Sequence, residues 1–192
     1  MFYEVEIKDH IRVPPIKFGE FVEESVLKSL VDKFEGYVSE DLGFVIGVST
    51  VEKIGEGVVI HGDGAAHYET TFKVLTFRPE LQEVVIGKIS DITDFGAFME
   101  IGPIDGMIHI GQTMDDFVSL NNNTLQGKES KKVLKINDIC RARIIAVSYK
   151  DPTNPKIGLT MRQNKMGNLK WLDEETKKVK SKKWKKYVKS AN

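Results

Sequence analysis

Five short runs of alternating apolar and polar residues between Glu83 and Arg162 limit the folds open to this chain more than any other feature. Glycine-containing turns separate the runs, and no helical spacing of apolar residues interrupts the pattern. Because successive side chains of a strand point to opposite faces, each run can bury one set of residues and expose the other. Short strands with glycine at the corners are typical of a small closed barrel, so we expect a five-stranded barrel of the oligonucleotide-binding (OB) type. The expected strands are residues 83–92, 97–102, 105–110, 138–148 and 156–162.

The residues before this region mix strand and helix patterns. A first strand is expected over 2–13, ended by two prolines, and apolar residues recur at helical spacing from Phe18 to Phe34. Glycine-bounded runs at 43–54, 57–62 and 67–77 predict further strands. The sequence thus predicts an α+β chain in which a small sheet covered by one helix precedes the barrel. The expected domains are residues 1–80, the barrel at 81–167 and a basic tail at 168–192.

A long polar segment, residues 114–133, separates the third and fourth expected strands of the barrel. A loop of this length is unusual inside a small domain and is often functional or mobile. Its lysines, Lys128, Lys131 and Lys132, can extend a path for RNA, and a solvated loop explains them equally well.

Bulk composition places the chain among globular proteins of a reducing compartment. It has 192 residues, 41% hydrophobic and 29% charged, enough for one ordinary domain or two small ones. We find no apolar run long enough to span a bilayer and no signal-peptide pattern at the N-terminus. A single cysteine, Cys140, excludes an internal disulfide. We therefore expect a cytoplasmic protein without membrane contact.

Charge is distributed unevenly although the formal net charge is zero. Residues 1–80 hold 8 Lys+Arg against 15 Asp+Glu, a balance of −7, whereas residues 170–192 hold 9 against 3, a balance of +6. An acidic first half is a poor nucleic-acid binder and a plausible docking surface for a basic protein. The basic end can meet phosphate or simply be a solvated tail.

Alternation within the barrel strands separates a filling set from an outward set of side chains. The filling set comprises Ala97, Met99, Ile101, Ile108, Ile110, Cys140, Ala142, Ile144, Ala146, Ile157, Leu159 and Met161. The outward set comprises Lys88, Phe98, His109, Arg141, Arg143, Lys156 and Arg162, with Phe95 at a turn. Aromatic rings stack on bases and cations neutralise phosphate, so this set indicates single-stranded nucleic acid as the ligand. The alternative is structural: Phe95 and Phe98 plug the barrel mouth, and His109 is a hydrogen-bonded strand residue.

A resemblance to the S-one RNA-binding domain family is carried by IGKISDITDFGAFMEIGPIDGMIHIG, residues 86–111. The glycine of the first strand, the FGxF turn and the strand that ends in histidine all match. The resemblance implies that Phe95, Phe98 and His109 contact RNA. At the fourth turn, Ser148 and Lys156 align where many members carry Asp and Arg.

A wider resemblance covers nearly all of residues 1–167 and is carried by VPPIKFG, by the run from Ile54 to Ile89 and by IGLTMRQ. In these motifs the chain resembles the larger stalk subunit of archaeal RNA polymerase, a relative of the seventh subunit of RNA polymerase II. The resemblance implies a non-catalytic subunit of a nucleotidyltransferase, with an N-terminal tip that docks on the polymerase core near the clamp. It also implies a small stalk subunit as partner and the emerging transcript as ligand. The expected core contacts are Gly62, Asp63 and Gly64.

Competing interpretations are weaker. We find no nucleophile with a nearby base and no paired acids in a recognisable motif, so we expect no active site and no cofactor. The glycines of residues 55–64 lack the GK[ST] ending of a phosphate loop, and His61, Asp63 and His67 fit no standard metal spacing. Two alternatives stay open: an S-one-type protein of translation initiation or RNA degradation, and a scaffold whose barrel serves protein contacts.

Overall fold

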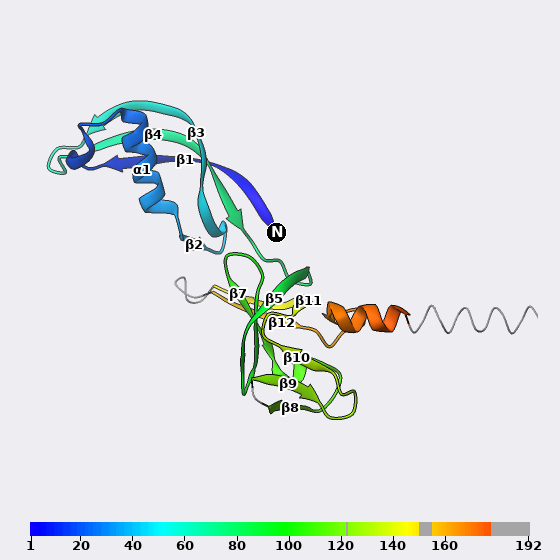
Figure 1. Cartoon of the computed structure of the whole chain (residues 1–192). Helices are drawn as coiled ribbons and strands as arrows, with labels where there is room; N and C mark the ends of the chain where they lie inside the picture. The colour runs from blue at the N-terminus through cyan, green and yellow to red at the C-terminus, as the bar shows by residue number, and fades with distance from the viewer. Residues whose placement is uncertain (122, 150–154, 178–192) are drawn as a thin grey trace, which may run out of the picture. The chain divides into compact units, whose positions relative to one another are not determined.

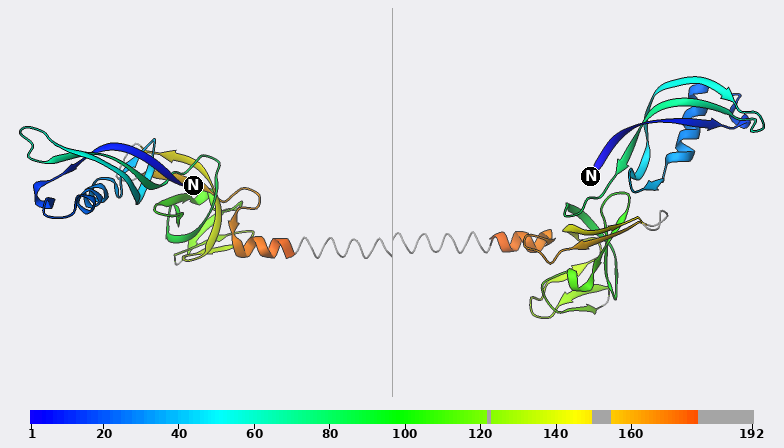
Figure 2. Two further views of the ribbon diagram at one scale, coloured as in Figure 1. Left: turned by 90° about the horizontal axis from the view of Figure 1, so that it is seen from above. Right: turned by 180° about the vertical axis from the view of Figure 1, so that it is seen from behind.

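The computed structural model describes residues 1–121, 123–149 and 155–177, which form two compact units (Figure 1, Figure 2). The first unit is Met1–Pro79, to which the described residues of 149–155 also belong, and the second is formed by Glu80–Ser148 and the residues from Lys156 onward. No helix of the described residues is long and apolar enough to cross a membrane.

The first unit is a four-stranded antiparallel sheet with one helix on one face (Figure 1). Its strand order is β1-β4-β3-β2, so β3 and β4 form a long hairpin and β1 pairs with the far side of β4. Its elements are β1 (Phe2–Val13), η1 (Pro15–Lys17), α1 (Val22–Phe34), β2 (Val38–Ser39), β3 (Gly43–Val59) and β4 (Ala66–Phe77).

The core of this unit lies between α1 and the sheet. Leu30 of α1, Ile11 of β1 and Phe72 of β4 are almost completely buried, and the rings of Phe34 and Phe72 lie 5.0 Å apart. On β3 every third residue packs toward this core: Val45, Val48, Val51 and Ile54. Register shifts against β4 follow each of these four residues, and such bulges let a period of three replace the ordinary alternation.

Two boundaries predicted in this unit are wrong. A break was predicted between residues 54 and 57, whereas β3 runs unbroken from Gly43 to Val59 because its bulges absorb the extra residues. The helix was predicted from Phe18 and begins at Val22, after a 3-10 turn at Pro15–Lys17. Proline sets that turn, and Gly19 disfavours continuing it as a helix.

The second unit is a closed five-stranded barrel, which confirms the fold class. Its strands run in the order β12-β7-β6-β5-β11, and pairing of β11 with β12 closes the barrel. Only the β12–β7 pair is parallel among these described pairings. The strands are β5 (Val84–Thr93), β6 (Gly96–Glu100), β7 (Asp105–His109), β11 (Ile139–Ser148) and β12 (Lys156–Thr160). The short elements η2 (Ile110–Gln112) and β13 (Gly167–Asn168) belong to the same unit.

The filling set predicted from alternation is buried with two exceptions, Ala146, which is exposed, and Ile110, which is half-buried in η2. Met99, Ile108 and Leu159 are at most 1% exposed, as expected for barrel filling. Ala146 is exposed, because a register shift between Ile144 and Ala146 turns the end of β11 out of phase. Alternation alone does not reveal such a bulge.

The long polar segment of the barrel is ordered as a small antiparallel sheet, β8 (Val118–Asn121), β9 (Thr124–Gly127) and β10 (Val133–Lys135). Asp116 fixes its base by accepting hydrogen bonds from the amides of Glu129 and Ser130 and from the Ser130 hydroxyl. These bonds hold the pKa of Asp116 below its usual range. Residues 169–177 are helical, and the rest of the predicted basic tail, 178–192, lies outside the described residues.

Candidate nucleic-acid interface

The β6–β7 hairpin brings the predicted aromatic residues together. Phe95, in the turn before β6, is 46% exposed, and Phe98 is half-buried on β6. Their rings lie 6.0 Å apart at 89°, an edge-to-face pair. A base stacked on this pair would meet two rings at right angles. The exposure of Phe95 favours a binding surface, whereas half-buried Phe98 fits both a stacking surface and a plug of the barrel mouth.

Gly96 sets the geometry of this turn. Its φ is +156°, and a Cβ at this position would lie 2.1 Å from the carbonyl oxygen of Ile108. Only glycine therefore allows β6 to approach β7 so closely at the point where Phe95 and Phe98 diverge. The amide of Ile110 donates to the Phe95 carbonyl at 2.9 Å and closes the other side of the turn.

His109 lies at the end of β7, directly opposite Gly96 in the strand register. Its ring is exposed, and its Nδ1 accepts a hydrogen bond from the amide of Gly111 at 3.2 Å. When Nδ1 accepts, the ring proton is on Nε2, which can donate to a phosphate or base oxygen. The His109 ring thus has a fixed orientation, and its Nε2 donor has no partner in the part of the chain that the structure describes.

Met107 joins the same outer face, because it is opposite Phe98 in the register and alternates with His109 along β7. The two-residue period had placed Met107 beside His109, yet it was not included in the predicted site. A thioether packs well against aromatic rings. We define the aromatic platform as Phe95, Phe98, Met107 and His109.

The predicted cations are spread around the barrel rather than gathered on the platform. Lys88 on β5 is opposite Glu100 in the strand register. Arg141 and Arg143 lie on β11, which β5 separates from β6. Lys156 begins β12, near the Asp105 end of β7 rather than its His109 end. Within the part of the chain that the structure describes, none of these four forms a hydrogen bond, ion pair or cation–π contact with the platform, so their RNA role stays a prediction.

Two arginines have local roles that alternation did not indicate. Arg162 pairs with Asp115 at 2.8 Å. The Nε of Arg143 is buried without a hydrogen-bond partner among the described residues, so this side chain is partly enclosed by the barrel.

The predicted polymerase-contact residues form the turn between β3 and β4. Gly62 and Gly64 have φ values of +93° and +69°, which glycine adopts without strain. Asp63 accepts hydrogen bonds from Arg12 at 2.7 Å and from His67 at 2.8 Å, and these lower the pKa of Asp63 to about 2. The Asp63 carboxylate therefore fixes the turn to β1 and β4, which leaves the glycine backbone as its free surface.

Exposed apolar side chains surround this turn. Val13 and Val59 both pair with Ala66, so the segments after β1 and the end of β3 lie at one end of the sheet (Figure 1). Large apolar residues there are strongly exposed: Ile16 91%, Phe18 51%, Phe21 79%, Val58 61%, Val59 63% and Ile60 52%. We call this set the apolar tip. Clustered apolar exposure is typical of surfaces that bind proteins, membranes or ligands.

Comparison with known proteins finds two family models along the chain. Residues 8–64 match the SHS2 domain found in the N terminus of Rpb7p and Rpc25p, and residues 78–152 match the S1 RNA binding domain. The chain is 36% identical to the DNA-directed RNA polymerase subunit Rpo7 of Sulfolobus acidocaldarius, over 93% of this chain and 99% of that protein. It is also 36% identical to Rpo7 of Saccharolobus solfataricus, over 92% of this chain and 100% of the relative. Subunit RPC8 of Bos taurus RNA polymerase III is 32% identical over 56% of this chain and 53% of its own length.

Proposed function

Because this chain belongs to the Rpo7 family of DNA-directed RNA polymerase subunits, we propose that it is the large, non-catalytic stalk subunit of such a polymerase and binds single-stranded RNA through its barrel. The S1 RNA binding domain model supports the RNA part, since it covers the platform. Membership over nearly the whole chain favours this function over a role in translation initiation or RNA degradation.

The aromatic platform is the observation that carries the RNA proposal. Phe95 is exposed, Phe98 is half-buried, and Nε2 of His109 has no hydrogen-bond partner among the described residues. Stacking of a base on an aromatic side chain contributes about 1–3 kcal/mol and tolerates any sequence. We propose that the platform holds the emerging transcript without strong sequence preference.

Docking on the polymerase core is assigned to the apolar tip and the Gly62–Gly64 turn. On docking, each Å² of apolar surface removed from water would contribute about 25 cal/mol to the free energy of binding. The ion pair of Arg12 with Asp63 supports this role by holding the turn in one shape before binding. The small stalk subunit is the further partner that we propose, and the cytoplasmic location stays a prediction.

RNA binding is tested with the full chain and a fluorescent single-stranded RNA at several salt concentrations. We expect Phe98→Ala to weaken binding about tenfold, from the loss of one stacked base. Phe117→Ala is the matched control, because Phe117 is 75% exposed in the same unit but outside the platform. Equal affinities of the two variants would refute the platform, and no RNA binding by the wild-type chain would refute the RNA function.

Assembly is tested separately, by adding the chain and the small stalk subunit to a polymerase core that lacks both. We expect co-elution of all components on size exclusion. Failure of the wild-type chain to join the core would contradict the stalk proposal whatever its RNA affinity.

A further inference from the structure

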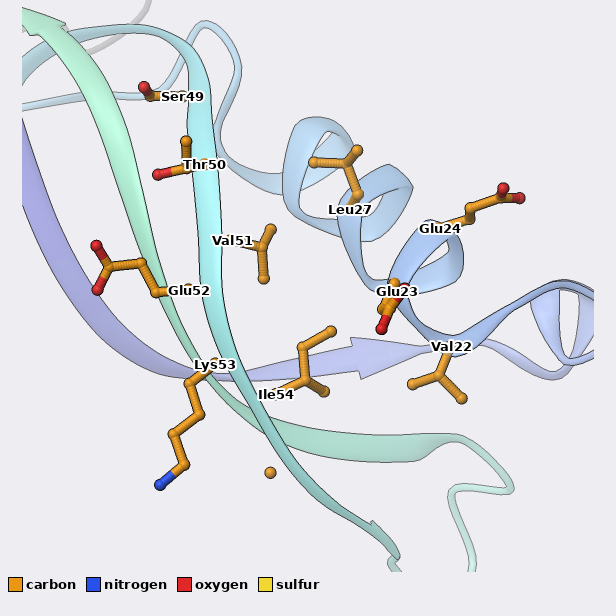
Figure 3. A pocket seen from close by; sticks show the side chains of 11 residues that line it. Val22, Glu23, Glu24, Leu27, Ser49, Thr50, Val51, Glu52, Lys53 and Ile54 are labelled. Carbon is orange, nitrogen blue, oxygen red and sulfur yellow. The ribbon is translucent and has the colours of Figure 1, made fainter.

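The first unit carries a groove that its fold leaves open. The groove has a volume of about 630 Å³ and lies between the first two turns of α1 and the middle of β3 (Figure 3). On the helix it is lined by Val22, Glu23, Glu24 and Leu27, and on the strand by the seven residues from Ser49 to Gly55. Seven consecutive residues present backbone as well as side chains, so the groove follows the edge of the strand.

This edge of β3 has no partner strand along most of its length. One side of β3 pairs with β4 throughout, whereas on the other side β2 pairs only with Gly43 and Phe44. The Val45 backbone is bonded to Gly36 and Tyr37, and beyond Val45 no described strand continues the sheet on that side. A long unpaired edge is a template for an added strand.

Apolar side chains form the floor of the groove. Leu27 and Val22 of α1 are 42% and 47% exposed, and they face Val51 and Ile54 of β3 across the groove (Figure 3). A strand added beside β3 would direct every second side chain under α1, onto these four residues. The helix α1 therefore covers the position beside β3 where one more strand would lie. No strand of the described residues occupies that position.

The charge of the groove selects among possible occupants. Its lining residues include Glu23, Glu24, Glu52 and Lys53, and the Glu52 carboxylate lies on the side of β3 that faces away from α1 (Figure 3). Glu52 is paired with Lys73, whereas Glu23 and Glu24 have no ion-pair partner among the described residues. Their place in the first turn also stabilises the helix, but that does not remove their charge from the rim.

We propose that this groove and the free edge of β3 bind an extended segment of a partner protein, which adds a strand to the sheet and carries alternating apolar and basic residues. RNA is disfavoured because the carboxylates repel phosphate. A second copy of the chain is disfavoured as well. Antiparallel pairing of two β3 edges would place both helices on one face, with their acidic first turns near each other. The lining of the groove shares no residue with the apolar tip or with the aromatic platform.

The proposal is tested with the full chain and a short fluorescent peptide of alternating lysine and valine, with a glutamate–valine peptide as the charge control. Binding is followed by anisotropy, and amide hydrogen exchange maps where it occurs. We expect the lysine peptide to bind more tightly than the glutamate peptide and to slow exchange in the segment from Ser49 to Gly55. This experiment uses no polymerase, so its outcome is independent of the stalk proposal.

Two Leu→Gln substitutions, one in the groove and one outside it, separate the loss of groove binding from a general effect of the substitution on the protein. Leu27→Gln removes an apolar contact from the groove and keeps a residue that suits a helix, and we expect it to weaken the lysine peptide about tenfold. Leu75→Gln is the matched control, because Leu75 is 39% exposed on the opposite face of the same sheet. We expect this control to bind like the wild type.

Four results would overturn the proposal: no binding of the lysine peptide, equal binding of the glutamate peptide, equal loss in both Gln variants, or unchanged exchange at residues 49–55. Slow exchange in the chain alone of those amides in 49–55 that point away from β4 would also overturn it. If that slow exchange depended on protein concentration, the groove would be occupied by a second copy of the chain. If it disappeared on deletion of residues 178–192, the groove would be occupied by the chain's own C-terminal end.

Discussion

Replacing Gly96 by alanine is the sharpest test of how the barrel builds its platform. The new Cβ would lie 2.1 Å from the Ile108 carbonyl oxygen, 3.0 Å from the Ile108 carbonyl carbon and 3.1 Å from the Cα of His109. Carbon and oxygen normally approach to about 3.2 Å, so β6 and β7 would have to separate by about 1 Å. All three contacts are backbone atoms, which cannot rotate away, and the φ of +156° adds strain. Overpacking of this kind costs about 2–4 kcal/mol.

Urea unfolding, followed by tryptophan fluorescence, measures this cost in the second unit, which contains the barrel. Both tryptophans of the chain, Trp171 and Trp184, follow the barrel strands, and the ring of Trp171 lies near Gly167. We expect Gly96→Ala to lower the unfolding midpoint, and its RNA affinity to fall as Phe95 and His109 shift.

Gly111→Ala is the control for this prediction. Its Cβ would lie 3.5 Å from Nδ1 of His109, an ordinary contact, and no positive φ opposes it. We expect Gly111→Ala to change the free energy of unfolding by no more than about 0.5 kcal/mol. A midpoint for Gly96→Ala equal to that of Gly111→Ala would refute the steric reasoning.

Three further perturbations have defined outcomes. The Cys140 thiol is buried with its pKa raised to about 12, so we expect no reaction with a thiol reagent at pH 8 in the native chain and full reaction in urea. The pKa of Asp63 is lowered from 3.8 to about 2, so its stabilising effect is complete above pH 4 and is lost as pH falls through 2. In Asp63→Asn we expect stability to lose this dependence on pH, measured by following acid unfolding of the first unit with circular dichroism. An acid-unfolding profile equal to that of the wild type would contradict the prediction. Val59→Glu at the apolar tip, 63% exposed, should reduce assembly with the polymerase core on size exclusion while leaving the free energy of unfolding within about 0.5 kcal/mol of the wild-type value; full assembly would refute the tip as the docking surface.

Alternation and glycine spacing were sufficient to predict the barrel because its strands obey the ordinary period of two. The same rule separated Met99 and Ile108 as filling from Phe98 and His109 as outward residues, and their burial agrees. The prediction of Ala146 as filling was wrong because one bulge reverses the phase of a strand without changing its composition.

The first unit was harder to predict because β3 follows a period of three. Val45, Val48, Val51 and Ile54 resemble neither a regular strand nor a helix, and the bulges that make this spacing possible depend on pairing with β4. Pairing with a distant segment leaves no local signal. The apolar tip shows the same limit: Phe18 and Val58 look like core residues until the fold leaves them exposed.

RNA cross-linking within a transcribing polymerase tests the central claim most directly. A stalled complex containing this chain and a transcript with 4-thiouridine near the exit is irradiated, and the linked peptides are identified by mass spectrometry. We predict cross-links to this chain within the β6–β7 hairpin, around Phe98 and His109. Cross-links confined to residues 1–79, or to other subunits alone, would contradict the assignment of the barrel as the surface that receives the transcript.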